Sequence, residues 1–462
     1  MKPIAVIGAG ITGLTAAWRL KEKNIPVKIF EAADRVGGVV QSLRRDGYLV
    51  EFGPNSILET SPVISGLVRD LGLEPRKIYS SPAAEKRFIV RGQKPIAMPA
   101  SPLGIIKTSL FSPLAKLRLL AEPFISPAPE GTDESIAGFT CRRLGQEFLD
   151  YAIDPLVAGV YAGNPELLSV AQAFPKLHAL EQRYHSLILG QILGARERKR
   201  RHEVSKQEAK KLSFDEGLQV LIDSLRDHLA DEIETSCRID HLERRGEHWI
   251  VETPHHGAAE FSAVLLALPA HKMAALDIRS AAALDLELLR KVYYPPVATI
   301  VLGFKRFDVR HPLDGFGMLI PKKEGFNILG ALFSSSLFPN RAPEHEVAIT
   351  CFIGGARSPN LALRPHEDLF AMAARDLSAI LNITGPPTFR HATVYRQAIP
   401  QYNLGFEKFR ALMADMESKA PGLFVAGHAR DGISLSDSIV SGHKIADRIS
   451  EFLAVETHSL VA

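Results

Sequence analysis

Four residues near the N-terminus have the types and spacing that dinucleotide binding requires. Gly8, Gly10 and Gly13 form a Gly-x-Gly-x-x-Gly pattern, and Glu31 follows 18 residues after the last glycine. Glycines at this spacing allow a tight turn and the close approach of a pyrophosphate, whose charge the N-terminus of the next helix stabilises. The acidic residue can accept hydrogen bonds from a ribose hydroxyl. Such glycines can also form a turn that only packs, and Glu31 does not distinguish NAD from FAD.

The elements that must hold this turn are readable in the same segment. Ile4–Ile7 is an apolar run without polar alternation, typical of a strand buried on both faces of a parallel sheet. Residues 14–23 have helical periodicity, and Val27–Phe30 form a second apolar run that ends at Glu31. Strand, turn, helix, strand and acidic residue agree with one βαβ unit, which favours the dinucleotide interpretation.

Two further segments favour FAD over NAD. Arg35 precedes the glycine pair Gly37 and Gly38 just beyond the second strand. Near the C-terminus, residues 421–427 form an apolar strand ending in glycine, followed by a loop and a helix predicted at 435–449. A second helix N-terminus aimed at the ligand suits the partly negative end of a reduced flavin. This pairing of chain ends resembles the flavin-containing amine oxidase superfamily.

Four blocks between the two ends resemble one family of that superfamily, the oxygen-dependent, FAD-containing protoporphyrinogen oxidases. The blocks are 52–56, 154–169, 332–355 and 398–405, and the most specific is GVYAGNPELLS at 159–169. The resemblance implies an α/β fold in which a discontinuous Rossmann-like FAD-binding domain joins a mixed-sheet substrate domain and a helical, membrane-associating lobe. The implied boundaries are 1–80, 212–285 and 415–462 for the FAD domain, 95–211 for the lobe and 286–414 for the substrate domain.

The motifs and the resemblance together imply the site residues. Cofactor contact is expected for Gly8, Ala9, Gly10, Ile11, Thr12, Gly13, Glu31, Ala32, Arg35, Gly38, Val39, Gly53, Pro54, Asn55, Ser56, Ile239, Ala267, Gly427, Ile433, Ser434 and Leu435. A catalytic or substrate-contacting role is expected for Arg87, Asn55, Gly159, Leu319, Leu332 and Phe352. Phe406 and His428 depart from the family's pattern, which commonly has histidine at the first position and asparagine or a small residue at the second.

The reaction that the resemblance implies is the oxidation of protoporphyrinogen IX to protoporphyrin IX in porphyrin biosynthesis. Three two-electron steps would pass through FAD to molecular oxygen, which becomes hydrogen peroxide. A flat apolar substrate with carboxylates at its edge needs apolar walls and a basic rim group, and Arg87 can bind a carboxylate with two hydrogen bonds.

Three alternative functions stay open. The first is the same chemistry on coproporphyrinogen III, which carries two more propionates and would require more basic residues around its pocket. The second is another oxidase of the superfamily, acting on amines or carotenoids. The third is a non-catalytic relative that chaperones a lipidated partner, although such a relative would lack the flavin fingerprint that Gly8, Gly10, Gly13 and Glu31 preserve here.

Composition excludes several other classes of protein. The chain has 462 residues, of which 46% are hydrophobic and 23% charged, as in an ordinary globular protein. A net charge of +3 is too small to predict nucleic-acid binding. Cys141, Cys237 and Cys351 are far apart and form neither a disulfide framework nor a Cys-x-x-Cys metal motif, so a reducing interior is expected.

Hydropathy bears on where the protein is located. No apolar stretch approaches the roughly 18 residues that a transmembrane helix needs. Residues 102–120 are apolar with three basic residues, and they fit either a helix lying in a bilayer interface or core helices of a helical lobe. We therefore expect a cytoplasmic protein or one peripheral to the inner face of the cell membrane. The sequence does not determine the oligomeric state, and a homodimer is among the open alternatives.

Overall fold

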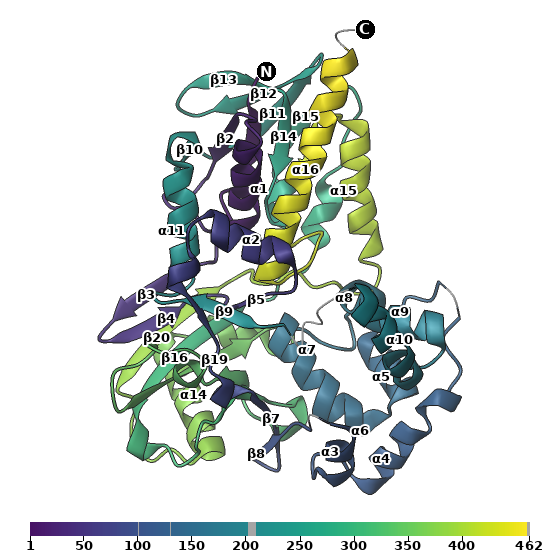
Figure 1. The fold of residues 1–462 in the computed structure, drawn as a ribbon, viewed down its shortest axis with the longest axis vertical. Coiled ribbons are helices and arrows are strands. Elements are labelled where there is room, and N and C mark those ends of the chain that lie inside the picture. The colour runs from purple at the N-terminus through teal and green to yellow at the C-terminus, as the bar shows by residue number, and fades with distance from the viewer. Residues whose placement is uncertain (100, 130, 202–208, 460–462) are drawn as a thin grey trace.

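The structure is a computed structural model that describes residues 1–99, 101–129, 131–201 and 209–459. Figure 1 shows three regions: a parallel sheet with its helices at the top, a mixed sheet at the lower left and a lobe of short helices at the lower right. Both ends of the chain belong to the top region. The α/β fold class expected from the sequence is therefore confirmed.

The top region is built around a five-stranded parallel sheet with strand order β10-β2-β1-β14-β21. These strands are β10 (Ile233–Glu234), β2 (Val27–Phe30), β1 (Ile4–Ile7), β14 (Ala263–Leu266) and β21 (Leu423–Val425). Since they come from three distant parts of the chain, this region is discontinuous in sequence. The strands expected at Ile4–Ile7 and Val27–Phe30 are confirmed.

Both faces of this sheet are covered, which explains why its strands are apolar without alternation. On one face α1 (Ile11–Glu22) packs against α16 (Leu435–Ser459), with α2 (Pro62–Asp70) and α11 (Gln219–His228) beside them. The other face packs on α15 and on a four-stranded sheet. These elements are α15 (Glu407–Lys419), β11 (His241–Arg245), β12 (His248–Thr253), β13 (Gly257–Phe261) and β15 (Asp277–Arg279).

The lower-left region is a seven-stranded mixed sheet with strand order β20-β16-β19-β18-β17-β7-β8. Its strands are β20 (Phe389–Tyr395), β16 (Val297–Lys305), β19 (Glu346–Gly354), β18 (Ile328–Leu332), β17 (Gly315–Leu319), β7 (Lys86–Arg91) and β8 (Lys94–Ala97). Helix α14 (His366–Leu381) covers one face, where Phe88, Met318 and Cys351 are buried. The side chains that alternate with these three point to the opposite face.

Two small sheets connect the upper and lower regions. One pairs β3 (Ser42–Arg45) with β4 (Tyr48–Glu51), and the other has the order β5-β9-β6. The strands of the second sheet are β5 (Ile57–Leu58), β9 (Lys211–Phe214) and β6 (Lys77–Tyr79). Both sheets lie at the waist of the molecule in Figure 1, next to the mixed sheet.

The lower-right lobe consists of short helices held together by a buried ionic network. The helices are α3 (Pro102–Lys107), α4 (Pro113–Leu120), η3 (Glu122–Phe124), α5 (Ile136–Arg143), α6 (Gln146–Phe148), α7 (Asp154–Tyr161), α8 (Val170–Ala173), α9 (Pro175–Tyr184) and α10 (Leu187–Arg201). At its centre the fully buried Arg143 contacts Glu122 at 3.1 Å and Glu181 at 2.5 Å. Segment 102–120 is two helices, because Ser112 caps a new helix at Pro113.

Candidate functional site

The glycine turn leaves space at the N-terminus of α1. Gly8 has a φ of +103°, and a Cβ on Gly13 would lie 2.0 Å from the Gly8 carbonyl oxygen, so helix and strand touch there. Helix α1 begins at Ile11 with no side chain capping it. A Cβ on Gly10 would meet no atom within 4 Å. An uncapped helix N-terminus that opens on free space fits the pyrophosphate of a dinucleotide.

The second glycine motif lies directly against the first. Gly10 and Gly37 form a β-bridge, and the Gly37 amide donates to the Ala9 carbonyl over 2.8 Å. A Cβ on Gly38 would lie 3.5 Å from the Gly10 Cα. The structure therefore brings the two motifs together at the end of β1, as the expected cofactor site requires.

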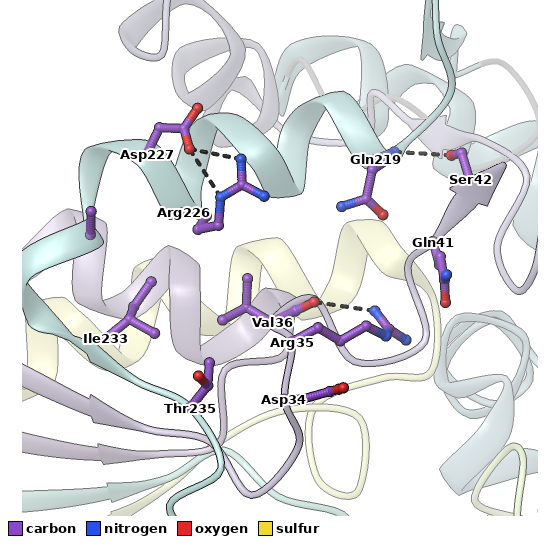
Figure 2. A pocket seen from close by; sticks show the side chains of 11 residues that line it. Asp34, Arg35, Val36, Gln41, Ser42, Gln219, Arg226, Asp227, Ile233 and Thr235 are labelled. Atoms are coloured by element: carbon purple, nitrogen blue, oxygen red, sulfur yellow. Dashed lines mark hydrogen bonds and ion pairs between the residues drawn. The ribbon is translucent and has the colours of Figure 1, made fainter. Parts of the chain in front are cut away.

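Arg35 supports this second motif from the solvent side. Its guanidinium donates to the carbonyl oxygens of Val36, at 3.2 Å, and Gly38, at 2.6 Å. Figure 2 shows the Arg35 side chain beside a cavity of roughly 550 Å³ between α11 and the loop after β2. None of the residues expected to contact the substrate lines this cavity. Arg35 therefore braces the loop that carries Gly38.

Glu31 is fixed at the end of β2 by backbone amides. Its carboxylate accepts from the Ala9 amide at 2.8 Å and from the Ala33 amide at 2.9 Å. Ala32 next to it is exposed, and Ile239 is buried in a loop that follows β10. The carboxylate is thus held next to the glycine turn, where a ribose hydroxyl of a bound dinucleotide would lie.

The C-terminal loop meets the same turn from another side. Gly427 has a φ of +107°, and a Cβ there would lie 3.4 Å from the Thr12 hydroxyl oxygen. The Ser434 hydroxyl accepts from the Asp437 amide at 3.1 Å and so caps α16, which leaves its backbone rather than its hydroxyl for a ligand. Ile433 and Leu435, on either side, are partly exposed.

Two of the other expected cofactor residues, Ala267 and Gly53, lie against residues of the two glycine motifs or next to them. The Ala267 carbonyl oxygen would be 2.8 Å from a Cβ on Gly8. A Cβ on Gly53 would be 2.6 Å from the carbonyl oxygen of Val39, an apolar residue that is 51% exposed. Pro54, Asn55 and Ser56 follow and are partly exposed. The Asn55 amide donates to the Gly53 carbonyl at 3.0 Å, so the Asn55 side chain lies beside Gly53, another residue expected at the cofactor.

Four residues expected at the substrate lie on one face of the mixed sheet. Arg87 on β7 and Leu332 on β18 are both register partners of Gly317 on β17. Leu319 pairs with Gly330, which in turn pairs with Phe352. Because side chains alternate along strands, all four point away from α14, and each is partly exposed.

Helix α7 lies over this face and adds Gly159. Gly159 is exposed, and a Cβ on it would lie 2.4 Å from Leu319 Cδ2. Ala158 and Ala162 of the same helix pack with Phe352. Helix α7 is held in place by Asp154, whose carboxylate accepts from the Lys322 amide at 2.8 Å and from Arg357 at 2.9 Å. The structure thus brings Gly159 together with Leu319 and Phe352.

Arg87 is the cation at the edge of this face. Its guanidinium carbon lies 5.8 Å from the centre of the Phe316 ring, and burial lowers its pKa below the ordinary value. Among the described residues, the Arg87 side chain has no carboxylate within ion-pair distance. A half-buried guanidinium of this kind is suited to receive an anionic group from a ligand.

The sequence did not assign a role to Tyr402, which links the loop after β21 to α7. Its hydroxyl donates to the His428 carbonyl at 2.6 Å and accepts from the Gly432 amide at 3.1 Å. Its ring lies edge-on to Tyr161 of α7, with 6.1 Å between centroids. Tyr402 lies in the 398–405 block, but a single chain does not show that residues so far apart meet.

The imidazole of His428, in the loop after β21, is uncharged at neutral pH. Burial, together with a smaller effect of His271, lowers the pKa of its imidazole to about 4. The ring packs edge-on to Tyr294 with 5.9 Å between centroids. Within the described part of the chain, no group of three histidine, cysteine, aspartate or glutamate side chains could hold a metal ion.

The chain is similar to known flavoproteins over nearly its whole length. The model of the flavin containing amine oxidoreductase family matches residues 11–450. A chloroplastic/mitochondrial protoporphyrinogen oxidase 2 of Arabidopsis thaliana is 34% identical, over 98% of this chain and 94% of the relative. A coproporphyrinogen III oxidase of Bacillus subtilis is 29% identical, over 96% of each chain.

A solved structure shows the same fold. It is a protein of Exiguobacterium sp. 255-15 provisionally assigned as a protoporphyrinogen oxidase. It superposes with a TM-score of 0.81 at 23% identity, over 97% of this chain and 98% of the other. Cyclohexylamine oxidase of Brevibacterium oxydans has a TM-score of 0.70 at 15% identity, over 98% and 99%.

Proposed function

Because this chain belongs to the flavin containing amine oxidoreductase family and is therefore an FAD-dependent oxidoreductase, we propose that it oxidises protoporphyrinogen IX to protoporphyrin IX. The observation that carries the proposal is the arrangement of Arg87, Leu319, Leu332 and Phe352 on one sheet face under Gly159. An apolar face with a cation at its edge suits a flat macrocycle whose carboxylates lie on its rim.

Each of these residues has a defined part in the proposed reaction. Leu319, Leu332 and Phe352 offer apolar surface to the faces of the macrocycle, and Gly159 approaches it without a side chain. Arg87 binds a propionate and so orients the ring. FAD, when bound, supplies the two-electron acceptor. Six hydrogens leave the porphyrinogen in total, and three molecules of oxygen become three of hydrogen peroxide.

An anaerobic half-reaction tests this proposal directly. The holoenzyme is mixed with protoporphyrinogen IX, and bleaching of the flavin absorbance is followed against time. Because porphyrinogens also oxidise in air without enzyme, the flavin-free protein serves as the control for the porphyrin fluorescence that appears after oxygen is admitted. The proposal predicts fast bleaching with protoporphyrinogen IX and porphyrin fluorescence once oxygen is admitted. Absence of bleaching with any porphyrinogen would refute it.

Coproporphyrinogen III is the second candidate substrate. Two of the similar relatives are named coproporphyrinogen III oxidases, from Bacillus subtilis and Staphylococcus aureus, at 29% and 28% identity. The half-reaction is therefore run with both porphyrinogens under the same conditions. A larger kcat/KM for coproporphyrinogen III would make it the substrate in place of protoporphyrinogen IX. The proposed oxidation through FAD would stay the same.

We also propose that the helical lobe rests on the inner face of the cell membrane. Large apolar side chains on α3, α4 and η3 are 63–89% exposed: Leu103, Ile106, Leu114, Leu117, Leu120 and Phe124. The Lys116 ammonium donates to the Ile106 carbonyl at 2.8 Å, which joins α3 to α4, and η3 contacts α4. An exposed apolar set of this size favours an interface with lipid. In the described part of the chain, no helix is long and apolar enough to span a bilayer.

Sedimentation with liposomes tests this membrane proposal. Leu117→Ser/Leu120→Ser should lower the fraction of protein that pellets with vesicles of anionic phospholipid. Phe307→Ser is the matched control, because Phe307 is 78% exposed on η7 (Arg306–Asp308), outside the lobe. Equal pelleting of the two variants and the wild type would contradict the proposal.

A further inference from the structure

Lys211 lies near Arg87, and both cations lie close to the same aromatic ring. Lys211 is the first residue of β9, and its ammonium nitrogen lies 5.6 Å from the centre of the Phe316 ring. The guanidinium carbon of Arg87 lies 5.8 Å from the same centre. Two cations therefore share the Phe316 ring, although they are more than a hundred residues apart in the chain.

The shared ring belongs to the apolar face of the candidate substrate site. Phe316 packs in a cluster with Leu332, one of the residues expected to contact the macrocycle, and with Ala84, Leu337 and Phe338. The two cations are thus at the edge of that face. Both side chains are partly exposed, so a ligand can reach them.

Neither cation has a hydrogen-bonded or ion-paired partner in the described part of the chain. Among the described residues, no hydrogen bond or ion pair joins the side chain of Arg87 or Lys211 to an acceptor. The neighbouring Lys86, by contrast, is paired with Asp314, and Lys77 is paired with Glu74 at 2.6 Å. Keeping two unpaired, half-buried cations close together is unfavourable without a bound anion.

The pKa of Lys211 is also what two unpaired cations close together would produce. Burial lowers the pKa of its ammonium group, the charge of Arg87 lowers it further, and the charge of Glu85 raises it less than either effect lowers it. Glu85 is exposed to solvent. The alternative, an ordinary surface lysine, would not place its ammonium group beside a second unpaired cation on the rim of an apolar face.

We propose that Lys211 and Arg87 bind two carboxylates on the same edge of the substrate, which makes Lys211 a second specificity-determining residue. This inference rests on the proposed function. The candidate porphyrinogens carry propionates on two neighbouring pyrrole rings, and two cations close to the single ring of Phe316 match such a pair. Arg87 offers a planar fork of donors to one carboxylate, and Lys211 offers a compact charge to the other.

The test compares Lys211→Met with Lys210→Met in the holoenzyme. Lys210 is the exposed neighbour whose ammonium nitrogen lies 5.2 Å from the centre of the Tyr79 ring, away from Phe316. Binding of protoporphyrin IX is measured by quenching of its fluorescence, together with KM and kcat for the porphyrinogen. Loss of a hydrogen bond to a charged group predicts that Lys211→Met raises Kd and KM about 10-fold. Lys210→Met should leave both unchanged, and kcat and flavin content should stay as in the wild type.

The dimethyl ester of protoporphyrin IX separates charge recognition from a structural effect. It lacks both carboxylates, so wild type and Lys211→Met should bind it equally. Lys211→Arg should keep most of the wild-type affinity for the diacid. Equal Kd values for the diacid in wild type and Lys211→Met would overturn the role of Lys211 alone. Failure of the wild type to bind or oxidise any porphyrin-type ligand would overturn the proposed function and this inference with it.

Discussion

Gly159 of α7 lies so close to Leu319 of β17 that a Cβ on the glycine would be 2.4 Å from Leu319 Cδ2. The colliding atom is the end of a flexible side chain, so Gly159→Ala should fold, with Leu319 turned into the space where the macrocycle is proposed to lie. We expect kcat/KM to fall about tenfold or more, which corresponds to roughly 1.4 kcal/mol of transition-state stabilisation. The free energy of unfolding should change by less than about 1 kcal/mol, since alanine favours helix.

The double variant Gly159→Ala/Leu319→Ala checks this explanation. Removing the Leu319 methyl groups leaves room for the new Cβ, so part of the lost kcat/KM should return. Leu319→Ala alone measures the apolar contact itself. If the two single effects simply add in the double variant, the close contact is not the cause and the prediction is wrong.

Arg87→Ala should raise KM for the porphyrinogen by about 10-fold and leave kcat nearly unchanged. The reason is that a propionate contact is present in both ground and transition states, so its loss removes uniform binding. Steady-state kinetics at constant ionic strength measure both constants. Lys86→Ala on the same strand is the control, because Lys86 is paired with Asp314. An unchanged KM in Arg87→Ala would exclude the carboxylate role.

The part of the fold that the sequence predicts best is the part with a local signal. Ile4–Ile7 and Val27–Phe30 are strands as predicted, because both faces of their sheet are buried and the runs are apolar throughout. The first helix begins at Ile11 rather than at residue 14, because its first turn lies inside the glycine motif. The periodicity of apolar residues does not reveal where a helix begins when its first turn is formed by a ligand-binding glycine motif.

The rest depends on contacts between distant residues. Lys211 reaches the Phe316 ring through the pairing of β9 with β5 and β6, and Tyr402 reaches His428 through a loop. No pattern within a single segment reports such contacts. The break in segment 102–120 was detectable, since Ser112 followed by Pro113 is a typical helix start.

Burial of the His428 imidazole should make the free energy of unfolding decrease in acid. The pKa of its imidazole is lowered to about 4 in the folded protein and is about 6.5 in the unfolded chain. A lowered pKa contributes stability that is complete above pH 6.5 and is lost as the pH falls towards 4, by up to about 3 kcal/mol. Thermal unfolding of His428→Asn should therefore depend less on pH in this window. His255→Asn, in an exposed turn, should keep the wild-type slope.

The buried ion pairs of Arg143 with Glu122 and Glu181 should contribute most to the stability of the helical lobe. Arg143→Met leaves the buried carboxylates of Glu122 and Glu181 without this cation, so the free energy of unfolding of the lobe should fall by about 3–5 kcal/mol. Hydrogen exchange in α5 and α9 measures this loss. Arg279→Met removes an exposed pair with Asp277 and should cost at most about 1 kcal/mol. Equal exchange in the two variants would contradict the prediction.

Gly10 and Gly13 should respond differently to the same substitution. A Cβ on Gly10 meets no atom within 4 Å and its φ is −71°, so Gly10→Val fits the protein without FAD. Valine there would occupy the space through which the phosphates approach, so bound flavin should be lost while the melting temperature of the flavin-free protein stays nearly the same.

A Cβ on Gly13, by contrast, would lie 2.0 Å from the Gly8 carbonyl oxygen, so Gly13→Val should lower the melting temperature of the flavin-free protein as well. The ratio of flavin to protein absorbance and a thermal melt separate the two cases. Full flavin content in Gly10→Val would show that the phosphates do not approach this turn. Equal melting temperatures of the two flavin-free variants would contradict the expected clash of a Gly13 side chain with the Gly8 carbonyl oxygen and with Val6.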